Sequence, residues 1–170
     1  SGRPRHPPRR TGEGVTAVDY VQHLRSRIGH APVNWAGVCA LVVNGSGEVL
    51  LQRRTDTGGW GTPGGIAELG EALEDTLVRE LHEETGLTPR DPLLFTVVSG
   101  PDTYVRLPNG DEFYQVTAVY VVREWNGSPR ADGVEGHALR FFPLDALPAG
   151  LGPVDRRAAV SYTHLTLPTN

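Results

Sequence analysis

A regular spacing of apolar residues marks the middle of the chain. Leu73, Leu77 and Leu81 recur every fourth residue, with Val78 beside them, so that a helix gathers them into one stripe. The spacing therefore predicts a helix over residues 72–85 whose leucines pack into a core.

Shorter apolar runs on both sides alternate with glycine- and asparagine-rich turns, which is typical of strands. Gly29 and Gly86 are placed to end an N-terminal amphipathic helix and the central helix, and Asn109-Gly110 closes a hairpin. A last helix is expected to begin near Asp155. The strands are expected at residues 35–43, 48–54, 93–99, 103–107, 113–124 and 139–142.

The polar side of the central helix carries an acidic cluster. Glu80, Glu83 and Glu84 fall at positions i, i+3 and i+4, which places three carboxylates on one face of a helix. They repel one another and lie at the helix C-terminus, where the dipole is also negative. Such a cluster makes physical sense when a divalent cation neutralises it, and carboxylate oxygens suit Mg²⁺ or Mn²⁺.

These glutamates belong to a longer motif between Gly65 and Leu87. It reads Gly-x5-Glu-x7-Arg-Glu-U-x-Glu-Glu-x-Gly-U, with U an aliphatic residue, and it resembles the Nudix box at every specified position. Such a match arises by chance on the order of once in a billion starting positions. The chain is identified as a member of the MutT-like Nudix hydrolases, which implies an α/β Nudix fold with a mixed β-sheet sandwiched between helices.

The resemblance also implies a reaction and a set of site residues. Nudix enzymes hydrolyse the diphosphate bond of a nucleoside diphosphate linked to another group, with Mg²⁺ (or Mn²⁺) as cofactor. Glu83 and Glu84 are the implied metal ligands, and Glu80 is either a ligand or the base that activates water. The remaining expected roles fall to Gly64 (a metal ligand through its carbonyl), Arg79 (orienting Glu80), Glu135 (the further acidic residue of a loop, with Glu112 as its rival), Arg53 and Tyr104 (substrate), and Glu71 (support of the substrate site).

The substrate stays open at this stage because the hints conflict. Pro101 lies about where ADP-ribose-hydrolysing members carry a proline, and Tyr104 lies where dinucleoside polyphosphate hydrolases often carry a tyrosine. ADP-ribose or a nucleotide sugar is favoured. The alternatives are a house-cleaning pyrophosphatase of (d)NTPs or dinucleoside polyphosphates, and a non-catalytic Nudix domain that senses a nucleotide.

Composition limits the number of domains, the partners and the cellular location that are expected for this chain. With 170 residues the chain has room for one domain with a sizeable core, and its net charge of −4 makes nucleic acid an unexpected partner. Cys39 is the only cysteine, which excludes an internal disulfide, and its apolar surroundings predict a buried small hydrophobe. No membrane span or signal peptide is visible, so a cytoplasmic location is expected. The expected partner is a small nucleotide, and a homodimer is left open.

The two ends of the chain differ from the middle. Residues 1–14 are rich in arginine and proline and are expected to form a disordered basic tail. The Nudix domain is expected to cover residues 15–160. Residues 161–170 break the preceding helical period and resemble a translated sequencing adapter, so they are expected to be non-native.

Overall fold

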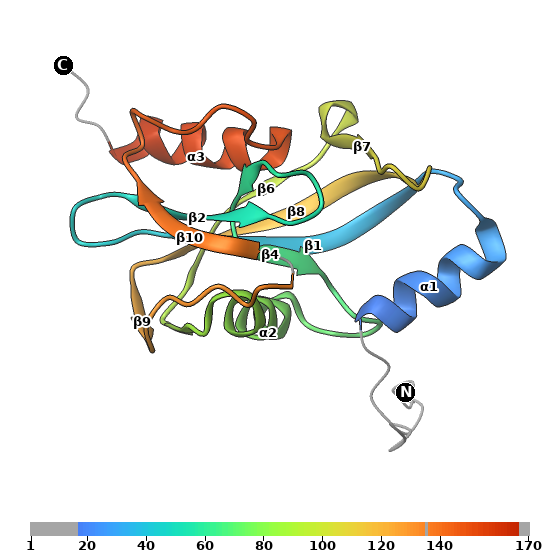
Figure 1. The fold of residues 1–170 in the computed structure, drawn as a ribbon, viewed down its shortest axis with the longest axis horizontal. Coiled ribbons are helices and arrows are strands. Elements are labelled where there is room, and N and C mark those ends of the chain that lie inside the picture. Colours follow the sequence, from blue (N-terminus) through green and yellow to red (C-terminus); the bar gives the residue numbers. More distant parts are fainter. Residues whose placement is uncertain (1–16, 135, 167–170) are drawn as a thin grey trace, which may run out of the picture.

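A computed structural model describes residues 17–134 and 136–166 of the chain (Figure 1). Its elements, in chain order, are α1 (Ala17–Ile28), β1 (Val33–Val42), β2 (Val49–Arg54), β3 (Trp60–Gly61), β4 (Gly64–Ile66), α2 (Leu73–Thr85), β5 (Thr88–Arg90), β6 (Leu93–Val98), the 3₁₀ turn η1 (Pro101–Thr103), β7 (Tyr104–Arg106), β8 (Glu112–Val122), β9 (Glu124–Asn126), β10 (Gly136–Phe142) and α3 (Pro153–Thr166).

The strands form a mixed arrangement around β1. This strand pairs in parallel with β8 along its whole length and antiparallel with β4, while β6 and β7 pair antiparallel with β8. A second sheet has the order β10-β2-β3, and β5 pairs with β9. β1 is thereby an inner strand, and its residues from Gly37 to Val42 are buried on both faces of the sheet, which explains why the strand is almost continuously apolar.

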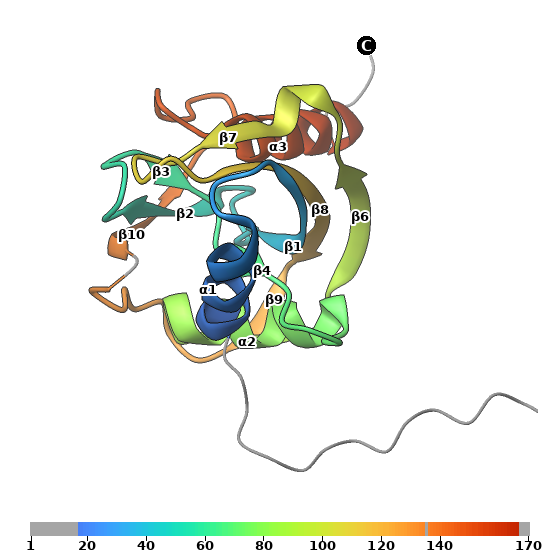
Figure 2. The ribbon, with the colours of Figure 1, turned by 90° about the vertical axis from the view of Figure 1, so that its right-hand side faces the viewer.

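The core is divided into two clusters by the strands. Alternate residues of β1 point to opposite faces, so Cys39 and Leu41 pack toward α3 whereas Val38 and Ala40 pack toward α2. Figures 1 and 2 show α2 and α3 on opposite sides of the strands. The predicted sandwich of a mixed sheet between helices is confirmed, and Cys39 is buried as expected.

Helix α2 follows its sequence pattern closely. Leu77 and Leu81 are fully buried, and Gly86 adopts the left-handed conformation (φ 74°) with its N–H bonded to the carbonyl of His82. Val78 departs from the expected stripe and is 43% exposed, because it lies one residue beyond Leu77 and turns away from the sheet.

Other elements differ from the sequence prediction. The six predicted strands are present with ends shifted by up to three residues, but β3, β4, β5 and β9, each of two or three residues, were not predicted. The last helix continues to Thr166 instead of ending near Val160, with Tyr162 buried against the core and its hydroxyl accepting a hydrogen bond from Arg123 (2.9 Å). The origin of this segment stays a prediction, and the expected basic tail lies outside the described residues.

In the part of the chain that the structure describes, no helix is both long and apolar enough to cross a membrane.

Candidate active site

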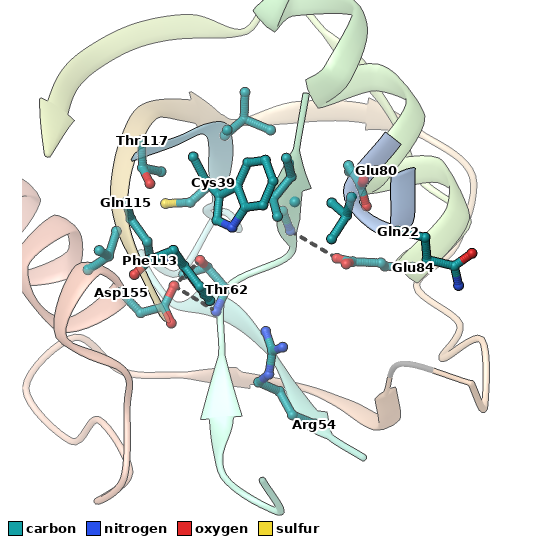
Figure 3. A pocket seen from close by; sticks show the side chains of 18 residues that line it. Gln22, Cys39, Arg54, Thr62, Glu80, Glu84, Phe113, Gln115, Thr117 and Asp155 are labelled. Carbon is teal, nitrogen blue, oxygen red and sulfur yellow. Dashed lines mark hydrogen bonds between the residues drawn. The ribbon is translucent and has the colours of Figure 1, made fainter. Parts of the chain in front are cut away.

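A cavity of about 400 Å³ opens between the three helices and the strands β1, β2, β4 and β8. Figure 3 shows Glu80 and Glu84 of α2 at one end of it and Asp155 of α3 with Thr62 at the other. The cavity has the size of small-ligand sites. Two helices far apart in the sequence, α2 and α3, therefore bring three carboxylates to one cavity.

Glu84 is held in place by two donors. Glu84 is 2% exposed, and its Oε2 accepts hydrogen bonds from the Gly64 N–H (2.9 Å) and from Gln52 Nε2 (3.0 Å). A desolvated carboxylate requires such donors, because burial without them is costly. The backbone of β4 and a side chain of β2 thus fix the end of α2.

Glu80, one turn earlier on α2, lies against β4. Arg79 NH1 donates to its Oε1 (2.7 Å), and a Cβ built on Gly65 would come within 2.4 Å of its carboxyl carbon. Only glycine at position 65 leaves room for this carboxylate in the cavity.

Arg79 forms the centre of an ion-pair network beside the cavity. Its guanidinium donates to both oxygens of Glu71 (2.8 and 2.9 Å) and to the carbonyl of Ile66 (3.2 Å), in addition to Glu80. The pKa of Glu71 is lowered to about 2, chiefly because it accepts these bonds from Arg79, and the surrounding carboxylates raise the pKa of Arg79. Glu71 acts through Arg79 and does not itself line the cavity.

The far end of the cavity contains a second set of polar groups. Burial raises the pKa of Asp155, although the hydroxyl and N–H of Thr62 donate to it and act in the opposite direction. Burial and the nearby Asp155 raise the pKa of Cys39 to about 12, which keeps this thiol protonated and unreactive. Arg54 lines the cavity and makes two hydrogen bonds to Asp56 (2.9 and 2.8 Å).

Aromatic and amide side chains complete the wall. Trp35 of β1 and Phe113 of β8 line the cavity together with Gln115, and α1 contributes Val21 and Gln22. An apolar wall with a few polar groups is typical of sites that bind a planar organic group.

Comparison with known proteins identifies the family of this chain. The family model of the NUDIX domain matches residues 33–162. The chain belongs to the Nudix family. The predicted family is confirmed, and the motif from Gly65 to Leu87 is its Nudix box.

Individual relatives agree with this assignment. The chain is 34% identical over 110 residues to an ADP-ribose pyrophosphatase of Methanocaldococcus jannaschii, a match that covers 63% of this chain and 61% of that protein. It is 29% identical over 121 residues to a putative 8-oxo-dGTP diphosphatase of Bacillus subtilis, covering 71% and 74% of the two chains. The crystal structure of a MutT Nudix hydrolase from Burkholderia pseudomallei superposes with a TM-score of 0.65 and 31% identity, over 75% of this chain and 97% of that one. The predicted class, a Nudix pyrophosphohydrolase, agrees with these names.

Several residues expected at the site do not line this cavity, and their roles stay predictions. Glu83 is 59% exposed and its nearest cation is Arg79 NH1 (3.6 Å). Arg53 lies outside the cavity because side chains alternate along β2, which turns Arg54 toward it instead. Tyr104 is 40% exposed on β7, where its hydroxyl donates to Glu112 and its ring contacts Tyr114.

Glu135 lies outside the described residues, so its role stays a prediction. The rival Glu112 is on β8 and does not line the cavity. Asp155 and Arg54 were not selected from the sequence, although the sequence placed a helix start at Asp155. Only the packing of α3 over the cavity gives Asp155 a place in the site.

The donor set of the box fits a hard divalent cation. Glu80 and Glu84 present carboxylates to the same cavity as Gly64, whose carbonyl was also an expected ligand. Glu83, the fourth expected ligand, does not line this cavity. Within residues 17–134 and 136–166, no three acidic, histidine or cysteine side chains are gathered as a complete metal centre. Two carboxylates nevertheless suffice for Mg²⁺, which keeps several waters and takes its other ligands from substrate phosphates.

Replacing Gly65 by alanine should remove activity without unfolding the protein. The added Cβ meets the flexible end of Glu80, so the carboxylate is displaced from the cavity while the strands keep their pairing. We expect a loss of turnover of roughly 100-fold, because small misplacements of site groups have effects of this size. Gly45→Ala is the matched control, since a Cβ there meets nothing within 4 Å. A Gly65→Ala enzyme with normal turnover would show that Glu80 is not needed where it lies.

Proposed function

We propose that this chain hydrolyses the diphosphate bond of a nucleoside diphosphate linked to another group, such as ADP-ribose or a nucleotide sugar, with Mg²⁺ or Mn²⁺ as cofactor. The observation that carries the proposal is one cavity that contains the Nudix-box carboxylates Glu80 and Glu84 at one end and is also lined by the aromatic side chains of Trp35 and Phe113. A diphosphate bound by these carboxylates and a nucleoside against these rings would share the same cavity.

Each group of residues at the cavity has a separate role in the proposed hydrolysis. Glu84, and Glu80 where it serves as a ligand, would hold the divalent cation, which would supply the positive charge that offsets the diphosphate. Arg79 orients Glu80, which is either a second ligand of the cation or the base that accepts a proton from the attacking water. Arg54 contacts a phosphate oxygen by exchanging one of its bonds to Asp56. Trp35 and Phe113 contact the nucleoside.

The charge of the cavity supports two phosphates rather than three. Among the described lining residues, Arg54 is the only cationic side chain, against the carboxylates of Glu80, Glu84 and Asp155. A triphosphate brings more negative charge than a diphosphate diester and requires more cations to offset it. The name of the archaeal relative, an ADP-ribose pyrophosphatase, points in the same direction.

The second candidate function is house-cleaning hydrolysis of nucleoside triphosphates. The name of the Bacillus subtilis relative, a putative 8-oxo-dGTP diphosphatase, favours it. Asp155 and Gln115 also place hydrogen-bonding groups in the cavity that suit the edge of a base in either class of substrate.

The test is hydrolysis of a panel by the purified chain with Mg²⁺, with Mn²⁺ and with neither. The panel contains ADP-ribose, UDP-glucose, dGTP, 8-oxo-dGTP and diadenosine tetraphosphate, and products are separated by anion-exchange chromatography. We expect the highest kcat/KM for ADP-ribose or UDP-glucose, with no turnover when the metal is removed by chelation.

Two other results would change the assignment. A higher kcat/KM for a triphosphate would select the house-cleaning function. A folded chain that binds a panel member by calorimetry but hydrolyses none would indicate a nucleotide-sensing domain. A homodimer and a cytoplasmic location stay predictions, and sedimentation of the purified chain tests the first.

A further inference from the structure

Gln52 is a buried polar residue at a position where the fold would accept an apolar one. It lies in the middle of β2, pairs with Leu139 of β10 and Gly61 of β3, and is 1% exposed. Two residues earlier on the same face, Leu50 packs into the apolar cluster under α2. An amide at this depth reduces stability unless its polar atoms are bonded.

Only one of the two polar atoms of the Gln52 amide has a hydrogen-bond partner within the described part of the chain. Its Nε2 donates to Glu84 Oε2 (3.0 Å), whereas its Oε1 is buried there without a hydrogen-bond partner. A buried acceptor without a partner is unfavourable, so packing alone does not explain a glutamine here. The bond to Glu84 is the contact that distinguishes Gln52 from an apolar side chain of similar size.

The neighbouring strand is shaped to admit this side chain. A Cβ built on Gly136 of β10 would lie 2.7 Å from Gln52 Oε1, and the pairing of β10 with β2 shifts register between Gly136 and Ala138. The glycine and the irregular register leave the space in which the amide reaches Glu84.

We propose that Gln52 is a positioning residue of the metal site, which holds the Glu84 carboxylate in the orientation that binds the divalent cation. The Gly64 N–H bonds the same oxygen, Oε2, from β4 (2.9 Å), so two donors on different strands fix one carboxylate atom. Hydrogen bonds that orient a ligating carboxylate raise metal affinity. The inference rests on the proposed function only in taking Glu84 as a ligand.

The test measures Mn²⁺ binding directly, by electron paramagnetic resonance of the free ion, without any substrate. Gln52→Met keeps the length and most of the volume of the side chain and removes the donor. We expect its dissociation constant for Mn²⁺ to rise roughly 10- to 100-fold. Leu50→Met is the control for packing on the same face of β2, with unchanged affinity. If Gln52→Met does not fold, Gln52→Asn replaces it, because its side chain is one methylene too short to reach Glu84. The same rise in the dissociation constant for Mn²⁺ is expected for Gln52→Asn.

A second readout uses the best substrate of the panel. The Mg²⁺ concentration that gives half-maximal turnover should rise in Gln52→Met, while kcat at saturating Mg²⁺ stays within a few-fold because Glu84 is still present. A folded variant that binds Mn²⁺ as tightly as the wild type would overturn the proposal, as would a wild type that binds none. Mn²⁺ binding that weakens in the variant, in a protein that hydrolyses no panel member, would support the role of Gln52 and reject the proposed activity alone.

Discussion

Replacing Glu84 by glutamine should lower metal-dependent turnover by about 1,000-fold or more. The substitution removes a carboxylate that lines the cavity yet keeps an oxygen to accept from Gly64 and Gln52, so the local structure is retained. A bound cation contributes several kcal/mol of transition-state stabilisation, and each 1.36 kcal/mol corresponds to about tenfold in rate. The measurement is kcat/KM on the best substrate at saturating Mg²⁺.

Thermal unfolding separates this loss from a loss of structure. In the absence of metal, Glu84→Gln should melt no lower than the wild type, because it removes one of two buried negative charges at the same face. Added Mg²⁺ should raise the melting temperature of the wild type and leave that of the variant unchanged, since only a ligand bound to the folded state stabilises it. Glu74→Gln is the matched control: the same helix and the same change of charge, at a side chain that accepts from Tyr120 outside the cavity. Activity within tenfold of the wild type would exclude Glu84 as a ligand.

The parts of the fold that depend on local spacing were predictable from the sequence. The leucines of α2 repeat within one helix, and Gly86 ends it through its own backbone conformation. The two strands β3 and β4 were missed because their glycine-rich residues have low strand propensity. They become strands only by pairing with β2 and β1, contacts that no local pattern reveals.

In the candidate site too, residues related by local spacing were predictable and residues brought in by tertiary contacts were not. Glu80 and Glu84 were identified because their spacing on one helix already defines a shared face. Asp155 enters the cavity through contact with Thr62, 93 residues away, and this approach of α3 is set by core packing. Whether Arg53 or Arg54 reaches the cavity depends on which face of β2 meets the cavity. Because the two arginines are consecutive, they point to opposite faces, and the sequence alone does not show which face that is.

Replacing Arg79 by methionine should impair both stability and catalysis. Arg79 is the cation for Glu71 and Glu80, with Glu83 also within 3.6 Å, and its side chain is 21% exposed. Removing one partner of a buried ion pair costs roughly 3–5 kcal/mol, and partial exposure reduces this to about 2 kcal/mol. We expect a melting temperature lower by roughly 4–8 °C. Turnover should fall roughly 100-fold because Glu80 loses the group that orients it.

The decrease in the free energy of unfolding at acid pH provides a test that is specific to the pair of Arg79 and Glu71. The pKa of Glu71 is lowered from 4.5 to about 2 in the folded chain, so the pair stabilises the fold above pH 4.5 and this contribution is lost as pH falls toward 2. Arg79→Met should therefore lose less stability than the wild type between these two pH values, measured by urea unfolding. Arg79→Lys keeps the charge without the planar fork and should restore part of the stability but little of the turnover. Parallel decreases for wild type and Arg79→Met would mean that Glu71 draws its low pKa from its other donors, the Glu68 N–H and the Thr76 hydroxyl.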